Sequence, residues 1–341
     1  MAFEDRTVTD RIAGRVLPLY GWQHTHIAKM IMVSENASYA IINRMTGSTD
    51  AVLRISRPGY HTLAELVSEV RWIDALDGYG HGINPAKVLP SLDRSCIRSI
   101  IGDDGVEYYC IMFEYINGVC LEECINEKIL ECFKTLGHMT AWMHIQSASW
   151  KDIVSIHRMH FNYENIIGEQ ADWGRWQDRK DIDRCSAYVM SEASDIIKLR
   201  LSEYGINNAN YGLIHADMRL ANIIIANDDN SMRVIDFDDC GFGWFVSDFA
   251  SSVSFMEERA IVPYLKDAWL NGYSAVRTLS DRDIGMIDTF VMMRRLQLTA
   301  WMAGHPESSP VKLYKENWIK NTKTLAHKYL SLIHISEPTR H

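Results

Sequence analysis

Residues 211–239 read YGLIHADMRLANIIIANDDNSMRVIDFDD and restrict the folds open to this chain more than any other stretch. Asp217 is followed by Asn222 at +5 and by Asp236 at +19. One aspartate that orients a hydroxyl, with an asparagine and a second aspartate that hold magnesium, suits a phosphoryl-transfer site. Asp and Asn are also common in turns, so the spacing carries weight only with the strand, loop and hairpin signals around it.

The two runs 222–226 and 232–237 resemble the arms of a hairpin around the turn 227–230. Such a hairpin would return Asp236 toward Asn222 and bring two oxygen ligands together, which is what magnesium requires from a protein. Arg219 follows Asp217 by two residues and is placed to stabilise the charge of a transferring phosphoryl group.

The N-terminal part of the chain predicts an antiparallel sheet. Residues 31–56 contain two β-rich runs joined by Thr46-Gly47-Ser48, which indicates a hairpin. Between Val33 and Tyr39 lies a polar turn whose backbone amides could cap nucleotide phosphates, with Ser34, Asn36 and Ser38 as candidates. This turn lacks a glycine-rich signature, so an ordinary turn remains the alternative.

Arg54 lies in the apolar strand AVLRI, from which a long cation could reach a phosphate. A helix is predicted from about residue 62 to residue 76, and Glu69 on it could pair with Arg54, as a strand cation and a helix glutamate do in kinases. The alternatives are a solvated strand face for Arg54 and a surface position for Glu69.

Strand signals at 96–101 and 106–113 give way to helical periodicity after 114–118, the segment EYING. We therefore predict an N-terminal lobe over 1–113, a hinge at 114–118 and a helical lobe over 119–329. Backbone groups of the hinge, at Glu114 and Ile116, would face an adenine edge; the alternative is an ordinary loop at a domain edge.

Two groups of histidines need separate interpretation. The predicted helix after residue 121 buries one side, on which His144 is interpreted as a hydrogen-bonded core residue. His157 and His160 would share a face if their segment were helical, but no cysteine or acidic ligand joins them at metal spacing, which disfavours a zinc site.

Composition excludes several classes of protein. The net charge of -9 argues against nucleic acid as a partner, because a phosphate backbone calls for clustered Lys and Arg. The 7 cysteines contain no CxxC pair, which indicates reduced thiols and a cytoplasmic location. No signal peptide and no run of about 18 apolar residues is found, so no membrane association is expected. Residues 330–341, LSLIHISEPTRH, resemble a translated sequencing adapter and not a continuation of the helix predicted at 321–329.

The motifs HADMRLAN from His215, IDFDD from Ile235 and GWFVSDFA from Gly243 resemble the aminoglycoside phosphotransferase and choline kinase family. The resemblance is greatest to the bacterial branch that contains stress response kinase A and type II homoserine kinases. It extends over nearly the whole chain, since ENASYAI, LRISRPGY, SEVRWIDAL, FEYINGV and WGRW follow in the family's order. It implies an α+β, bilobal protein-kinase-like fold with a small antiparallel β N-lobe and a larger, mainly α-helical C-lobe.

The resemblance also implies roles for single residues. Asp217 would be the catalytic base or would orient the hydroxyl, and Asn222 and Asp236 would bind magnesium. Arg54 would contact the α- and β-phosphates and Glu69 would hold it. Of two further matches, His215 would brace the loop and Asp248 would support it.

The chain departs from the family pattern at two positions. Arg stands at residue 54 where Lys is commoner, and a planar fork is not equivalent to a point charge. Asp238 stands where protein kinases have glycine. It would either join a second magnesium ion or accept hydrogen bonds from the loop.

The acceptor is the least determined part of the site. Candidates to line its wall are Trp269, Tyr273, Met292, Arg294, Arg295, Trp301 and His305, although most aromatic residues at helical spacing belong to the core. The segment Trp173-Gly174-Arg175-Trp176 is either core packing or part of this wall. Aminoglycosides would require acidic residues, for which Glu257 and Glu258 are the adjacent pair, although both could face solvent. The arginine pair 294–295 would equally suit an anionic acceptor or a protein.

Together these patterns predict an ATP- and Mg²⁺-dependent kinase that phosphorylates a hydroxyl of a small molecule, such as an aminoglycoside, homoserine or choline. Two alternatives stay open: a Ser/Thr protein kinase resembling stress response kinase A, and a nucleotide-binding regulatory protein with weak catalysis. The second is disfavoured because Asp217, Asn222 and Asp236 are all present. The sequence predicts no oligomeric state.

Overall fold

The computed structural model describes residues 6–33, 35–124, 128–306 and 308–336. The chain forms two compact units, each built from three segments. The first comprises Met1–Val119, Lys151–Arg158 and Ile224–Asp238, and the second comprises Cys120–Trp150, Met159–Ile223 and Asp239–His341. Neither unit is therefore a single continuous stretch of sequence.

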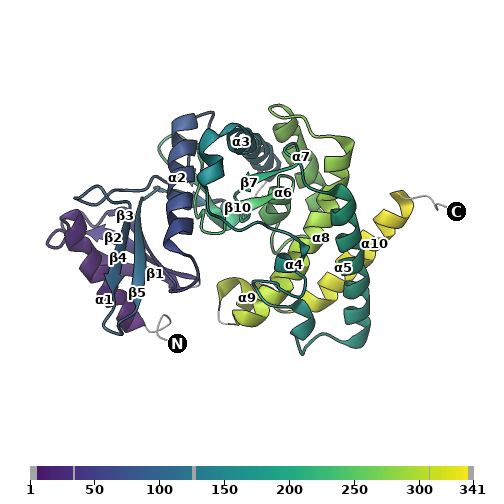
Figure 1. Ribbon diagram of the computed structural model, residues 1–341, viewed down its shortest axis with the longest axis horizontal. Helices are drawn as coiled ribbons and strands as arrows, with labels where there is room; N and C mark the ends of the chain where they lie inside the picture. Colours follow the sequence, from purple (N-terminus) through teal and green to yellow (C-terminus); the bar gives the residue numbers. More distant parts are fainter. Residues whose placement is uncertain (1–5, 34, 125–127, 307, 337–341) are drawn as a thin grey trace. The chain divides into compact units, whose positions relative to one another are not determined.

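The first unit is built around a 5-stranded antiparallel sheet in the order β1-β2-β3-β5-β4 (Figure 1). The strands are β1 His26–Val33, β2 Asn36–Asn43, β3 Thr49–Ser56, β4 Ile97–Ile101 and β5 Glu107–Glu114. Gly47, with φ of 74°, makes the predicted turn between β2 and β3, because a positive φ suits glycine. Helix α1 (Arg6–Val16) packs against the sheet through Ile12, Ala13 and Val16.

Helix α2 (Leu63–Tyr79) begins with a capping box and confirms the predicted helix. The Thr62 hydroxyl accepts a hydrogen bond from the Glu65 amide at 3.3 Å, and the Glu65 carboxylate accepts one from the Thr62 amide at 2.7 Å. The helix buries Trp72 and, unusually for a charged side chain, Glu69. The start of α2 is thereby fixed six residues before Glu69.

A second sheet joins β6 (Gly118–Cys120), β8 (Ile223–Ala226) and β9 (Met232–Val234) in the order β6-β8-β9. The predicted second hairpin arm, 232–237, was too long. Strand β9 ends at Val234, and Asp236 has φ of 64°, a left-handed conformation that a strand residue does not adopt. Asp236 therefore lies in the loop that follows the hairpin.

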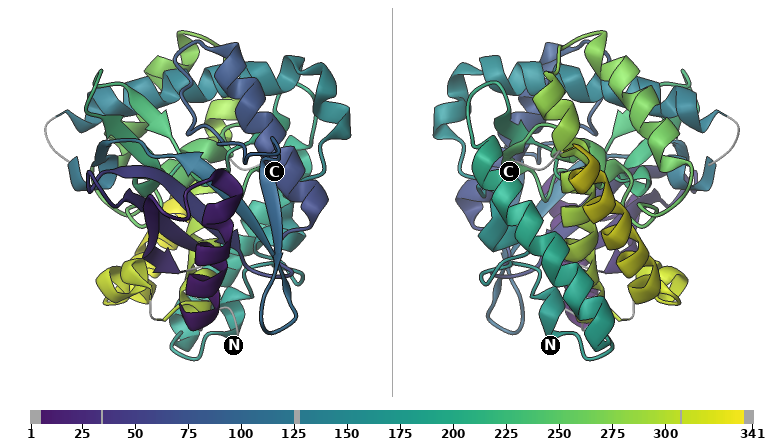
Figure 2. Two further views of the ribbon diagram at one scale, coloured as in Figure 1. Left: turned by 90° about the vertical axis from the view of Figure 1, so that its left-hand side faces the viewer. Right: turned by 90° about the vertical axis from the view of Figure 1, so that its right-hand side faces the viewer.

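The second unit is mainly helical. Its helices are α3 Ile129–Ser149, α4 Tyr163–Ile166, α5 Arg184–Tyr204, α6 Ser247–Ser252, α7 Val262–Ser274, α8 Asp281–Gly304, α9 Ser309–Tyr314 and α10 Trp318–Ser336. Helices α5, α8 and α10 pack side by side, as Figure 2 shows. The antiparallel strands β7 (Tyr211–Ile214) and β10 (Gly241–Trp244) form a separate pair beside α3 and α6.

The condition for a shared helix face of His157 and His160, a helical segment, is not met. Residues 156–159 are not helical, so His157 and His160 share no helix face. No group of three or more His, Cys, Asp or Glu within the described residues is arranged to hold a metal ion.

Helix α10 continues to Ser336, seven residues past the predicted end at 329, and it buries Ile333. No helix in the described part of the chain is long and apolar enough to cross a membrane.

Helices α3 and α7 approach closely because each has a glycine at the contact. A Cβ added to Gly272 would lie 1.8 Å from the carbonyl oxygen of Lys134, and one added to Gly137 would lie 2.0 Å from that of Trp269. We expect Gly272→Ala to lower the free energy of unfolding by about 1–3 kcal/mol, because the two backbones must separate. Gly285→Ala in α8, with nothing within 4 Å of the added Cβ, should be neutral or slightly stabilising. Urea unfolding of both variants tests this, and equal effects would contradict it.

Candidate active site

The loop that carries Asp217 is held from below by one buried carboxylate. Strand β7 leads into the loop, where Ala216 has a positive φ of 66°. Asp248, on α6 and 0% exposed, accepts hydrogen bonds from the backbone amides of His215 at 3.2 Å and Ala216 at 2.8 Å. The structure thus confirms Asp248 as a residue that supports the loop.

A polar chain in the core continues from Asp248. His144 of α3 contacts Asp248 Oδ2 through Nε2 at 3.1 Å and the Tyr273 hydroxyl through Nδ1 at 2.8 Å, and Arg277 donates to that hydroxyl at 2.7 Å. Burial lowers the pKa of His144, although its hydrogen bond to Asp248 opposes the shift. A neutral ring that donates from Nε2 and accepts at Nδ1 satisfies both neighbours, which confirms His144 as a hydrogen-bonded core residue.

Both carboxylate oxygens of Asp217 are engaged. Arg294 Nη2 donates to Oδ1 at 2.6 Å, and Asn222 Nδ2 donates to Oδ2 at 2.8 Å. Arg219 Nε lies 3.5 Å from the same Oδ2. The Asp217 amide contacts His215 Nδ1 at 3.2 Å, which fits the predicted bracing role of His215. The side chain of Asp217 keeps 14% of its surface exposed, so a small group can still reach it.

The orientation of Asn222 agrees with a role in metal binding. Asn222 ends the short helix η5 (Leu220–Asn222), and its Nδ2 donates to both the carbonyl and the carboxylate of Asp217, at 2.9 and 2.8 Å. Its Oδ1, a hard oxygen, consequently points away from Asp217. In the other unit the Asp236 side chain is 48% exposed. A carboxamide and an accessible carboxylate are the donor types that magnesium prefers, so both residues fit such an ion.

In the first unit, Arg54 of β3 is buried among carboxylates. Its two terminal nitrogens donate to the two oxygens of Glu69 at 2.8 and 2.6 Å, which forms the predicted pair as a bidentate fork. Burial alone would lower the pKa of Arg54, but the charges of Glu69, Asp238 and Asp236 raise it above the ordinary value. The Nε atom of Arg54 is buried and has no hydrogen-bond partner among the residues that the structure describes. An anion bound beside Arg54 Nε would accept a hydrogen bond from it.

Asp238 is a partner of Arg54 in this unit. It is 5% exposed, accepts a hydrogen bond from Asn36 at 2.8 Å, and lies 3.4 Å from both Arg54 Nη1 and His61 Nε2. Burial raises the pKa of its carboxyl, but Arg54, His61 and Asn36 together hold that pKa below its usual range. These contacts favour the hydrogen-bonding role over that of a ligand for a second magnesium ion.

The other residues predicted to contact the nucleotide differ in their place in the strands. Ser38 lies on β2 directly opposite Arg54 on β3, whereas Ser34 falls outside the described residues. Glu114 ends β5, and its amide already donates to Lys87 O at 2.8 Å. Of its backbone groups, the carbonyl is therefore the one to consider for a hinge contact. Ile116 lies between β5 and β6, where no strand is formed.

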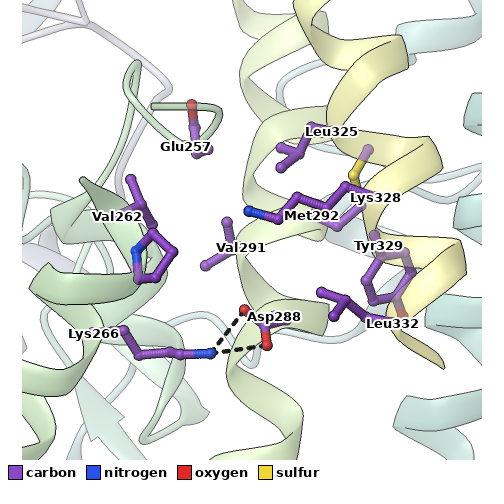
Figure 3. A pocket seen from close by; sticks show the side chains of 11 residues that line it. Glu257, Val262, Lys266, Asp288, Val291, Met292, Leu325, Lys328, Tyr329 and Leu332 are labelled. Carbon is purple, nitrogen blue, oxygen red and sulfur yellow. Dashed lines mark hydrogen bonds and ion pairs between the residues drawn. The ribbon is translucent and has the colours of Figure 1, made fainter. Parts of the chain in front are cut away.

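Only some of the predicted acceptor-wall residues are accessible. Trp269, Tyr273 and Arg295 are 0% exposed and belong to the core. Met292 and Glu257 instead line a separate pocket, with Val262, Pro263, Lys266, Asp288, Val291, Leu325, Lys328, Tyr329 and Leu332 (Figure 3). Asp217 does not line this pocket. On α8, Arg294 and Trp301 are seven residues apart and so share a face, and the Trp301 ring stacks on His305.

The adjacent arginines of α8 have different partners. Arg295 donates to Glu257 at 2.8 Å and to Glu258 at 2.9 Å, with its guanidinium 3.4 Å from the centre of the Trp318 ring. Glu257 is 3% exposed and the Glu258 side chain is 25% exposed, so neither acid simply faces solvent. The pair of acids neutralises Arg295 and is not an open site for a polycation. Arg294 contacts Asp217, a link that the sequence did not single out.

The sequence model of the phosphotransferase enzyme family matches residues 33–279. Amicoumacin kinase of Bacillus subtilis (strain 168) is 24% identical over 306 residues, which cover 86% of this chain and 83% of that protein. The structure of a microcompartment-associated aminopropanol kinase is 32% identical, with a TM-score of 0.84 over 94% of this chain and 97% of that one. A solved amicoumacin kinase, in complex with AMP-PNP and Ca²⁺, is 20% identical, with a TM-score of 0.71 over 94% and 93% of the two chains. The predicted protein-kinase-like fold is confirmed.

Proposed function

Because this chain belongs to the phosphotransferase enzyme family, we propose that it moves the γ-phosphoryl group of ATP to a hydroxyl of a small molecule. The observation that carries the proposal is the arrangement at Asp217. A carboxylate held on both oxygens, partly accessible and adjacent to Arg219 and Asn222, is suited to align a hydroxyl for attack. Little covalent chemistry is needed from the protein in phosphoryl transfer, so fixed geometry and charge are the main contributions.

The residues predicted for catalysis and for the phosphates have distinct roles in this proposal. Asp217 orients the acceptor hydroxyl and accepts its proton as the new bond forms, while Arg219 stabilises charge on the transferring group. Arg54, held by Glu69 and Asp238, binds the anionic part of the nucleotide. Asn222 and Asp236 would each offer an oxygen ligand to a magnesium ion, which would neutralise the charge of the phosphates.

For the acceptor we propose a small amino alcohol. The 32% identical solved relative is named an aminopropanol kinase, and another relative is named amicoumacin kinase. Trp173 and Trp301 offer partly exposed aromatic rings in the second unit, a surface that also suits alkylammonium groups. The cluster of Glu257, Glu258 and Arg295 gives no support to a polycationic aminoglycoside, because both acids already pair with the arginine.

A panel assay tests the function. Purified protein, radiolabelled ATP and Mg²⁺ are incubated with single amino alcohols, homoserine, choline, aminoglycosides or bulk protein as acceptor. We expect label transfer to one class of small hydroxylated amine, loss of transfer when EDTA removes the metal, and no label on bulk protein. Transfer only to bulk protein would support a Ser/Thr protein kinase instead. ATP binding without transfer to any acceptor would support a regulatory nucleotide-binding protein.

A further inference from the structure

Arg294 is the best-fixed cation near Asp217. Its Nε donates to Ser254 Oγ at 3.0 Å, its Nη1 to Gln297 Oε1 at 3.1 Å and its Nη2 to Asp217 Oδ1 at 2.6 Å. The guanidinium also lies 5.1 Å from the centre of the Trp173 ring. All three nitrogens and one face of the group are therefore occupied, and Arg294 is only 7% exposed.

We propose that Arg294 is a positioning residue for phosphoryl transfer, which sets the plane of the Asp217 carboxylate so that it can receive the acceptor hydroxyl. This inference rests on the proposed function. It assigns to α8, 77 residues further along the chain, a part in the reaction that the loop motif does not contain.

The two arginines that contact Asp217 differ in exposure and in how firmly they are held. Arg219 is more exposed, at 23%, and its Nε lies 3.5 Å from Oδ2, a distance at the outer limit of a hydrogen bond. Arg219 is therefore able to turn toward a phosphoryl group. Arg294, at 8% side-chain exposure and held at each nitrogen, is not. Because Arg294 is fixed in position, it holds the Asp217 carboxylate in one orientation.

Rotation of the carboxylate is restrained only when both oxygens are held. Asn222 fixes Oδ2 and Arg294 fixes Oδ1, at opposite ends of the group. Each oxygen can accept more than one hydrogen bond, so the acceptor hydroxyl can still bind to the carboxylate. Without Arg294 the group would be held firmly at Oδ2 alone and would turn about its Cβ–Cγ bond. Misplacement of a reacting group by about 1 Å can cost on the order of 10²-fold in rate.

Arg294→Ala tests the proposal with the best acceptor from the panel. We expect kcat to fall about 10²-fold while the KM for ATP changes little, because Arg54 and Glu69 are untouched. Added guanidine or methylguanidine should restore part of the lost rate by occupying the vacated place. Arg294→Lys should be intermediate at best, since an ammonium cannot reproduce the planar fork. Circular dichroism and thermal unfolding show whether the variants remain folded.

The control is Arg184→Ala, which removes an exposed arginine at the start of α5. Its kcat should equal that of the unaltered protein and should not respond to guanidine. A folded Arg294→Ala protein with full kcat, or one whose lost rate no guanidine restores, would overturn the positioning role while leaving the proposed function standing. If the unaltered protein transfers phosphate to no acceptor, the proposed function fails, and the role of Arg294 fails with it.

Discussion

Asp217→Asn should lower phosphotransfer by about 10³-fold and leave ATP binding nearly unchanged. An amide keeps the shape of the side chain, but it cannot accept the proton of the acceptor hydroxyl. It also presents an NH₂ group to either Arg294 or Asn222, where the carboxylate accepts hydrogen bonds from both. Initial rates with the panel's best acceptor give kcat, and isothermal titration with a non-hydrolysable ATP analogue gives the nucleotide Kd.

Asp195→Asn is the matched control for this substitution. Asp195 is an exposed aspartate of α5, and the same chemical change there should leave both kcat and Kd unaltered. Transfer by Asp217→Asn at more than a tenth of the normal rate would contradict the role given to this residue. A parallel loss of ATP binding would indicate that the substitution disturbs the loop as a whole and not the alignment of the hydroxyl.

The predictable parts of the site rest on local patterns. Arg54 and Glu69 could be paired from sequence because each lies in a clearly patterned element, a strand and a helix adjacent in the chain. The role of Asp248 could be expected because the motif around it resembles that of a known family. The loop residues Asp217 and Asn222 are five apart, so their contact needs only the short helix η5.

The contacts that the sequence did not predict depend on how the helices pack. Arg294 and Arg295 are adjacent and chemically identical, yet about 100° of helical rotation sends one to Asp217 and the other to Glu257. Helix α8 is buried around much of its circumference, so its hydrophobic pattern gives no sign of which side faces the loop. The sequence likewise left Trp269 and Tyr273 open between the acceptor wall and the core, where the structure places them, because an aromatic residue has the same helical spacing in either position.

Arg54→Met should reduce both stability and nucleotide binding. It leaves Glu69 and Asp238, which are 0% and 5% exposed, without their main cation. Removal of one partner from a buried ion pair typically costs about 3–5 kcal/mol, because the remaining charge stays desolvated. We expect urea unfolding to show a loss of this size, and the Kd of an ATP analogue to rise about 10²-fold or more.

The double variant Arg54→Met, Glu69→Met separates these two effects. When both charges of the pair are replaced by apolar groups of similar volume, much of the lost stability should return, although Asp238 still lacks its arginine. Nucleotide binding should not return, because no cation is left at this place to meet the phosphates. Arg11→Met provides the control, since Arg11 and Asp103 are 59% and 58% exposed and such a pair contributes about 0–1 kcal/mol. Recovery of ATP binding together with stability in the double variant would mean that Arg54 only holds the first unit together. Recovery of stability alone would identify Arg54 as the cation that binds the nucleotide.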